Sequence, residues 1–231
     1  MTLLILFTLF AGASSLFLDH PLHPNENAIR HIALKTVPDG ICVDSNFRYC
    51  QGRFNEALNL SPTLDWHDSD ALMARIRDFT DGNITTVFEI CGIYQEYRVC
   101  FHGMYPSCVN LYHLLSQDPK GINQAYTYVN TFQALDFICN IGFQEAVKQM
   151  DCIVSSESIP QYMVCYRKYV IGMNMDPSNI CGLLSETGNC LHDVYKSNCP
   201  IDPRAGGWFG CEMFRHTFED SCDDGGRCSV Y

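Results

Sequence analysis

Cysteines constrain the fold of this chain more than any other feature. There are 14 of them, an even number, within 231 residues. No two are separated by only two residues, and no His–Cys pair has finger-like spacing, so structural zinc has little support. In an oxidising compartment such a set is typical of a disulfide framework. We predict that all of them are paired: Cys42, Cys50, Cys91, Cys100, Cys108, Cys139, Cys152, Cys165, Cys181, Cys190, Cys199, Cys211, Cys222 and Cys228.

The N-terminus has the composition of a secretory signal peptide. Residues 1–15 carry no charged side chain and hold an apolar run, Leu3 to Phe10, followed by small residues. This pattern predicts cleavage after Ala13 or Ser15. The run is shorter than the roughly 20 apolar residues that span a bilayer, and no other stretch is long or apolar enough. We expect a secreted, extracellular protein without a membrane span.

The charge balance narrows the class of partner. Acidic residues number 26 against 15 basic ones, which gives a formal charge of −11. An excess of this size argues against binding to nucleic acid or to anionic membranes. We therefore expect extracellular proteins or matrix as partners.

The hydrophobic pattern favours helices. Apolar residues recur at helical spacing over 72–79, 84–94, 125–139, 143–150 and 161–172, whereas alternating, strand-like patterns are scarce. We predict a mainly α fold, a disulfide-stapled helical bundle with several short to medium helices. The 14 Phe and 12 Tyr are expected to fill the core between helices; a lipid-holding cavity is the alternative.

The domain plan follows from where the cysteines lie. Residues 16–41 are rich in His, Pro and Asn, and we expect a poorly ordered lead-in that ends in a short helix around Ile29 to Val37. Residues 42–228 form the cysteine-rich helical domain, with a candidate boundary near 117–121. Five cysteines precede that boundary and nine follow it. Because both counts are odd, at least one bridge must cross it, which favours a single domain.

Near the C-terminus, Cys211, Phe214, Phe218 and Cys222 fall on one face of a predicted helix. If this helix is continuous, its two cysteines lie about 16 Å apart, too far for a bond that needs Cα atoms within roughly 7 Å. Each is then expected to bond a neighbouring element.

A spacing recurs along the chain. Cys91, Cys100 and Cys108 stand nine and eight residues apart, and Cys181, Cys190 and Cys199 stand nine and nine apart. We do not infer a duplication from this spacing alone.

One glycosylation site is predicted. Asn83-Ile84-Thr85 is an acceptor sequence beside the turn signal Asp81-Gly82, which favours an N-glycan at Asn83. The alternative is that Asn83 only caps the following helix.

The most enzyme-like fragment is Cys190-Leu191-His192-Asp193. It resembles the Cys-x-x-His-Asp helix of secreted phospholipases A2, but the Cys–His spacing is one residue short and no Gly-rich calcium loop precedes it. We interpret His192 as a surface helical histidine. Common hydrolase, zinc and phosphate-loop motifs are absent, so we predict no catalytic, cofactor or metal residues.

The cysteine rhythm also carries a family resemblance. Phe137-Ile138-Cys139, Phe143-Gln144-Glu145 and the cysteines from Cys152 to Cys222 resemble the cysteine-rich helical domain of nematode chondroitin proteoglycan 4, over roughly residues 40 to 228. The resemblance implies an extracellular, non-enzymatic role in eggshell or other matrix. Chondroitin is attached at Ser-Gly dipeptides, and this chain has none.

The sequence leaves one expected function and two alternatives. We expect a secreted structural or protein-interaction module without catalytic activity, with matrix or eggshell as its candidate setting. The first alternative is a helical protein that binds lipid or a small ligand. The second is a divergent phospholipase A2-like hydrolase that uses His192 and Asp193.

Overall fold

The computed structural model describes residues 23–80, 84–218, 222 and 228. The predicted signal peptide over 1–15 and the predicted acceptor Asn83 lie outside this part of the chain. Within it the fold is all-α and has no strand, as predicted. The helices are α1 (Glu26–Lys35), α2 (Asp44–Ala57), α3 (Ser69–Thr80), α4 (Ile84–Cys100), α5 (Tyr105–Cys108), α6 (Leu111–Gln117), α7 (Ile122–Cys139), α8 (Phe143–Glu157), α9 (Pro160–Met175), α10 (Ile180–Asn198) and α11 (Pro203–Thr217).

Local sequence signals set several of these helix starts. The Asn25 side chain accepts a hydrogen bond from the Ala28 amide at the start of α1, and Asn110 caps α6 in the same way. Proline occupies the first position of α9 and α11, where a missing amide proton costs nothing. The periodic segments 72–79, 84–94, 125–139, 143–150 and 161–172 all lie inside observed helices.

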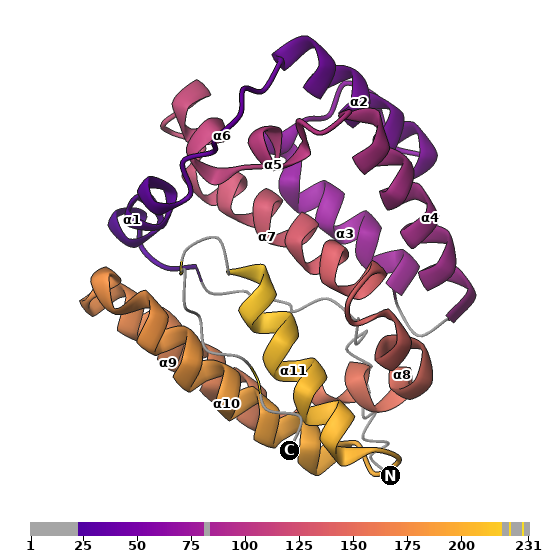
Figure 1. Ribbon diagram of the computed structural model, residues 1–231, viewed down its shortest axis with the longest axis vertical. Coiled ribbons are helices and arrows are strands. Elements are labelled where there is room, and N and C mark those ends of the chain that lie inside the picture. The colour runs from indigo at the N-terminus through magenta and orange to yellow at the C-terminus, as the bar shows by residue number, and fades with distance from the viewer. Residues whose placement is uncertain (1–22, 81–83, 219–221, 223–227, 229–231) are drawn as a thin grey trace, which may run out of the picture.

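Helix α7 runs through the middle of the molecule (Figure 1). It packs against α3 on one side and α11 on the other, and also contacts α4, α6 and α8. Its side chains Tyr128, Phe132 and Phe137 are almost fully buried. Burial on several sides explains why α7 shows a broad apolar surface rather than one narrow stripe.

Residues 16–22 of the predicted lead-in lie outside the described part of the chain, but helix α1 corrects the expectation of poor order over the residues that it spans. Ala28, Ile29 and Ile32 are buried, so α1 belongs to the core. The Asn25 amide donates to Asn174 Oδ1 on α9 at 2.6 Å, and Arg30 donates to the Pro119 carbonyl at 2.9 Å. The segment therefore joins two distant parts of the chain, and the short helix expected around 29–37 begins earlier than predicted.

All 14 cysteines are paired, as predicted, and none is free. The pairs join different secondary-structure elements rather than neighbouring turns. They are Cys42–Cys108, Cys50–Cys100, Cys91–Cys139, Cys152–Cys199, Cys165–Cys190, Cys181–Cys222 and Cys211–Cys228.

One bridge crosses the segment 117–121. Cys91 of α4 is bonded to Cys139 at the end of α7, with the Cα atoms 5.1 Å apart. The other six bridges stay on one side of that segment. The odd cysteine counts on the two sides predicted at least one such crossing.

The predicted C-terminal helix is too long. Helix α11 ends at Thr217, so Cys222 does not continue its face. The conclusion drawn from that helix nevertheless holds, because Cys211 pairs with Cys228 and Cys222 pairs with Cys181 of α10.

The same order of pairing occurs twice along the chain. In residues 42–139, the first cysteine bonds the fifth, the second bonds the fourth, and the third bonds the sixth. Residues 152–222 repeat this order if Cys211 is set aside. We call these segments the first and second repeat. Ile90-Cys91-Gly92 of α4 then aligns with Ile180-Cys181-Gly182 of α10. The recurring spacing thus reflects a repeated structure, which the sequence reasoning did not infer.

In each repeat two antiparallel helices are joined by the inner bridge. These pairs are α2 with α4, through Cys50–Cys100, and α9 with α10, through Cys165–Cys190. Both pairs form outer parts of the molecule (Figure 1). In the part of the chain that the structure describes, no helix is long and apolar enough to cross a membrane.

Candidate functional site

A wide groove lies between α2 and α4. It has a volume of about 810 Å³ and runs beside the Cys50–Cys100 bridge. Apolar side chains at its edge are open to solvent: Tyr49 is 59% exposed and Val99 is 69% exposed. Ala57 and Ile93 line it further along the two helices. We call this cavity the α2–α4 groove.

Charged residues of both signs rim the groove. Arg53 and Glu56 come from α2, and Glu96 comes from α4. All three lie at exposed positions. Exposed apolar side chains bordered by charged ones are typical of a protein-binding surface.

Buried polar side chains behind the groove form hydrogen bonds with one another, and these bonds fix the wall of the groove. Tyr97, which lines the groove, donates to Gln51 Oε1 at 2.9 Å and lies 2.7 Å from the Tyr128 hydroxyl. Tyr128 also donates to Gln51. Burial raises the pKa of Tyr97 well above its ordinary value, so it stays a neutral donor. Together with the Cys50–Cys100 bridge, this network holds the two helices at a fixed separation.

A second, more polar pocket of about 520 Å³ lies at the start of α2, beside the segment that precedes α3. There His67 lies between two carboxylates, with Nδ1 2.8 Å from Asp65 and Nε2 3.2 Å from Asp118. The Lys120 backbone amide holds the pKa of Asp118 below its usual value, and His67 contributes less. The three side chains are each roughly half exposed, so the arrangement resembles a surface ion-pair cluster of modest stability.

Three potential metal ligands meet near this pocket. Single ligand atoms of Cys42, Asp44 and His113 lie within 4.8 Å of one another. The Cys42 sulfur is already bonded to Cys108 and cannot act as a thiolate. Burial lowers the pKa of His113, with Asp44 opposing the shift. One imidazole and one carboxylate then remain, fewer than the three protein ligands of a typical catalytic zinc site.

Asp136 of α7 is a highly connected ionised group between the repeats. It accepts hydrogen bonds from Tyr94 at 2.9 Å, Arg98 at 2.6 Å and Asn140 at 2.9 Å, and its second oxygen lies 3.1 Å from His216 Nε2. Burial favours the neutral carboxyl, but the contacts with His216, Tyr94 and Arg98 outweigh it and lower the pKa. Because its partners fill the surrounding space, we interpret Asp136 as a structural group.

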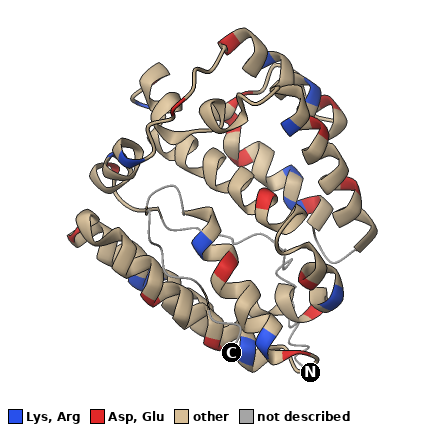
Figure 2. Ribbon diagram, in the orientation of Figure 1, with Lys and Arg blue, Asp and Glu red and all other residues tan. Residues whose placement is uncertain are grey.

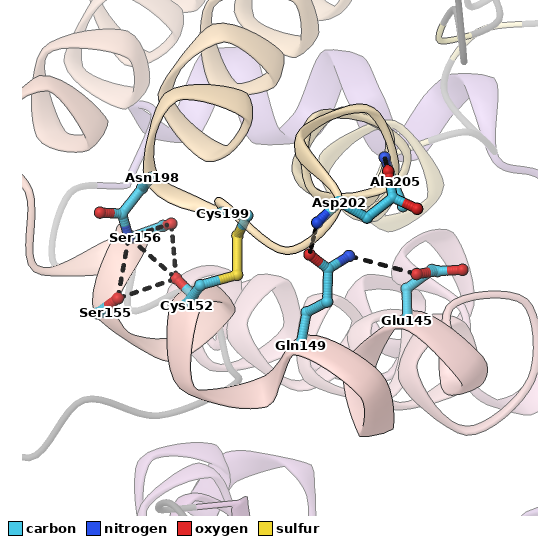
Figure 3. The surroundings of a disulfide bond; sticks show 9 residues. All are labelled: Glu145, Gln149, Cys152, Ser155, Ser156, Asn198, Cys199, Asp202 and Ala205. Atoms are coloured by element: carbon cyan, nitrogen blue, oxygen red, sulfur yellow. Dashed lines mark hydrogen bonds between the residues drawn. A yellow bond between two sulfur atoms is a disulfide. The ribbon is translucent and has the colours of Figure 1, made fainter.

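Polar side chains surround the Cys152–Cys199 bridge of the second repeat (Figure 3). Asn198 donates to the Cys152 carbonyl and contacts the hydroxyls of Ser155 and Ser156 at 2.9 Å. Gln149, at a non-helical position inside α8, accepts from the Asp202 amide at 3.2 Å. These contacts join α8 to the end of α10 and to the start of α11 around Cys152–Cys199, and we interpret them as structural.

His192 and Asp193, the residues that the hydrolase alternative requires, lie outside both of these cavities. His192 Nδ1 lies 3.1 Å from Oδ1 of Asp193, whose side chain is 81% exposed. His192 packs beside Gly207 of α11, where an added Cβ would lie 2.7 Å from the ring. Neither residue lines the α2–α4 groove or the polar pocket.

Charges of both signs are interspersed over the described helices (Figure 2). In this view the Lys and Arg positions of the described residues do not form an extended basic stripe. In this view the Asp and Glu positions are spread over several helices.

Sequence reasoning did not find the α2–α4 groove. Tyr49 and Val99 lie beside Cys50 and Cys100, yet nothing in the sequence shows that these cysteines bond each other. The exposed apolar neighbours of the bridge become informative only once the pairing is known.

Comparisons with protein-family models, with curated proteins and with solved structures find no match to this chain. No relative therefore transfers a function to it, and the resemblance to chondroitin proteoglycan 4 stays a prediction.

Proposed function

We propose that this chain is a secreted, non-catalytic protein-interaction module that acts outside the cell. The observation that carries the proposal is the α2–α4 groove, an open apolar surface next to a disulfide. Seven bridges are typical of a protein that folds in an oxidising compartment. A groove whose walls are covalently fixed loses little conformational entropy when a partner binds.

The lipid-binding alternative has less support. It requires a sizeable apolar cavity, but the central aromatic side chains contact one another closely. Phe132 lies with its ring centroid 4.9 Å from that of Tyr97 and 4.7 Å from that of Tyr128. The α2–α4 groove and the polar pocket both open to solvent. An acyl chain in either would stay partly wet, which weakens binding.

The experiment is a binding screen of the oxidised, full-length protein against secreted proteins of the organism that makes it. We expect at least one partner to bind reversibly with a defined affinity. In parallel, phospholipid, ester and peptide substrates are tested with and without calcium, and we expect no turnover. Calcium-dependent hydrolysis that is abolished by His192→Gln would overturn the proposal in favour of a phospholipase-like enzyme.

A further inference from the structure

The two repeats differ at the α2–α4 groove. In the first repeat, Ala57 lies two turns after Cys50 on α2, and Ile93 lies two turns before Cys100 on α4. Because the helices are antiparallel and joined by Cys50–Cys100, these residues face each other across the groove that both line.

The second repeat has the corresponding residues in a closed arrangement. Gly172 lies two turns after Cys165 on α9, which is the position of Ala57 on α2. Leu183 lies two turns before Cys190 on α10, which is the position of Ile93 on α4. The Leu183 side chain lies directly over Gly172, so closely that an added Cβ there would overlap both of its methyl carbons. A leucine thus fills the space between α9 and α10.

The first repeat cannot close in this way. Ala57 already carries the Cβ that Gly172 lacks, and Ile93 is branched at Cβ and stiff at χ1. The groove remains open, and its apolar edge residues Tyr49 and Val99 remain exposed. The second repeat therefore shows that a leucine side chain can fill the space between two helices that are paired in this way.

We propose that the α2–α4 groove binds a polypeptide segment of a partner protein through a branched aliphatic side chain, a leucine or isoleucine, inserted between Ala57 and Ile93. This inference rests on the proposed function and names the class of partner. The anchor reproduces the contact of Leu183 with α9. The mixed charges of Arg53, Glu56 and Glu96 at the rim then orient the segment.

The test uses the oxidised full-length protein and a phage-displayed library of random dodecapeptides. We expect the selected peptides to share a leucine or isoleucine whose change to alanine weakens binding about tenfold or more, as expected for an anchor residue. Ala57→Trp fills the groove and should abolish binding. Val99→Glu changes only an exposed edge residue and should weaken it. Met175→Trp adds the same bulk at an 81% exposed position of α9 and should leave it unchanged.

Thermal unfolding and non-reducing gels confirm that each variant folds with its bridges. Peptides that lack an aliphatic anchor, or that bind Ala57→Trp as well as the wild type, would overturn the inference. So would a wild-type dimer that Ala57→Trp dissociates, or a fluorescent fatty acid that only the open groove binds. If secreted partners bind Ala57→Trp normally, the proposed function stands while the groove assignment fails; if no secreted protein binds, the proposed function fails.

Discussion

His216 of α11 directs its Nε2 at Oδ2 of Asp136 in α7, 3.1 Å away. The contact joins the last helices of the two repeats, and both side chains are largely buried. On its other oxygen Asp136 receives Arg98 at 2.6 Å. One carboxylate thus joins α11 to α4 and α7, whereas the disulfide bridges connect only α4 and α7 directly.

Asp136→Asn tests this contact. The lowered pKa of Asp136 means that its charged form stabilises the fold above about pH 4, and that this contribution is lost as the pH falls through the lowered value. We expect the variant to lose about 2–3 kcal/mol at pH 7 in urea unfolding. The difference from wild type should shrink as the solution is acidified below about pH 4. Asp193→Asn, at an 81% exposed side chain, is the control and should change little. A pH-independent difference would contradict the role assigned to the charge.

Close packing of α10 on α11 depends on glycine. A Cβ at Gly210 would overlap the Tyr195 ring, whereas one at Gly92 of α4 meets nothing within 4 Å. We expect Gly210→Ala to lower the free energy of unfolding by about 1–3 kcal/mol through overpacking. Gly92→Ala should raise it by about 0.5–1 kcal/mol, because alanine is the better helix former. Thermal unfolding of both variants checks the pair, and equal effects would mean that the α10–α11 contact is looser than the structure shows.

The Cys91–Cys139 bridge ties α4 to the end of α7. Replacing both cysteines with serine should cost about 2–4 kcal/mol, because the unfolded chain regains freedom. The matched change at Cys211 and Cys228 removes the extra bridge of the second repeat and should cost a similar amount. The two variants should differ in limited proteolysis. Only the loss of Cys91–Cys139 should make the segment 117–121 more sensitive to cleavage, because only that bridge crosses it. Equal cleavage in both would argue against a special role for the crossing bridge.

The sequence predicted the helices well where apolar residues recur at helical spacing. Helices α4 and α7 are examples, since Val87, Tyr94 and Phe132 all face the core. At α1 it predicted a short helix around 29–37, but within a poorly ordered segment, because the surrounding His, Pro and Asn residues suggested disorder and Ala28 and Ile32 had no visible packing partner. A helix that is stabilised by distant parts of the chain leaves little local signal.

The repeat was only half visible in the sequence. Ile90-Cys91-Gly92 and Ile180-Cys181-Gly182 match, but α3 lies between Cys50 and Cys91, with no corresponding α-helix between Cys165 and Cys181. Unequal spacing hides the match until the bridges define which cysteines correspond. The α2–α4 groove was hidden for the same reason, because it depends on which helices are paired.

The most direct test of the repeated frame is a map of the disulfides in the oxidised protein, obtained by mass spectrometry of peptides cleaved without reduction. We predict the nested pairs Cys42–Cys108 with Cys50–Cys100 and Cys152–Cys199 with Cys165–Cys190, and one crossing pair, Cys91–Cys139. Finding the nested pairs in both repeats would establish the repeated disulfide arrangement on which the α2–α4 groove depends. A Cys50 or Cys165 bonded to any other partner would contradict it.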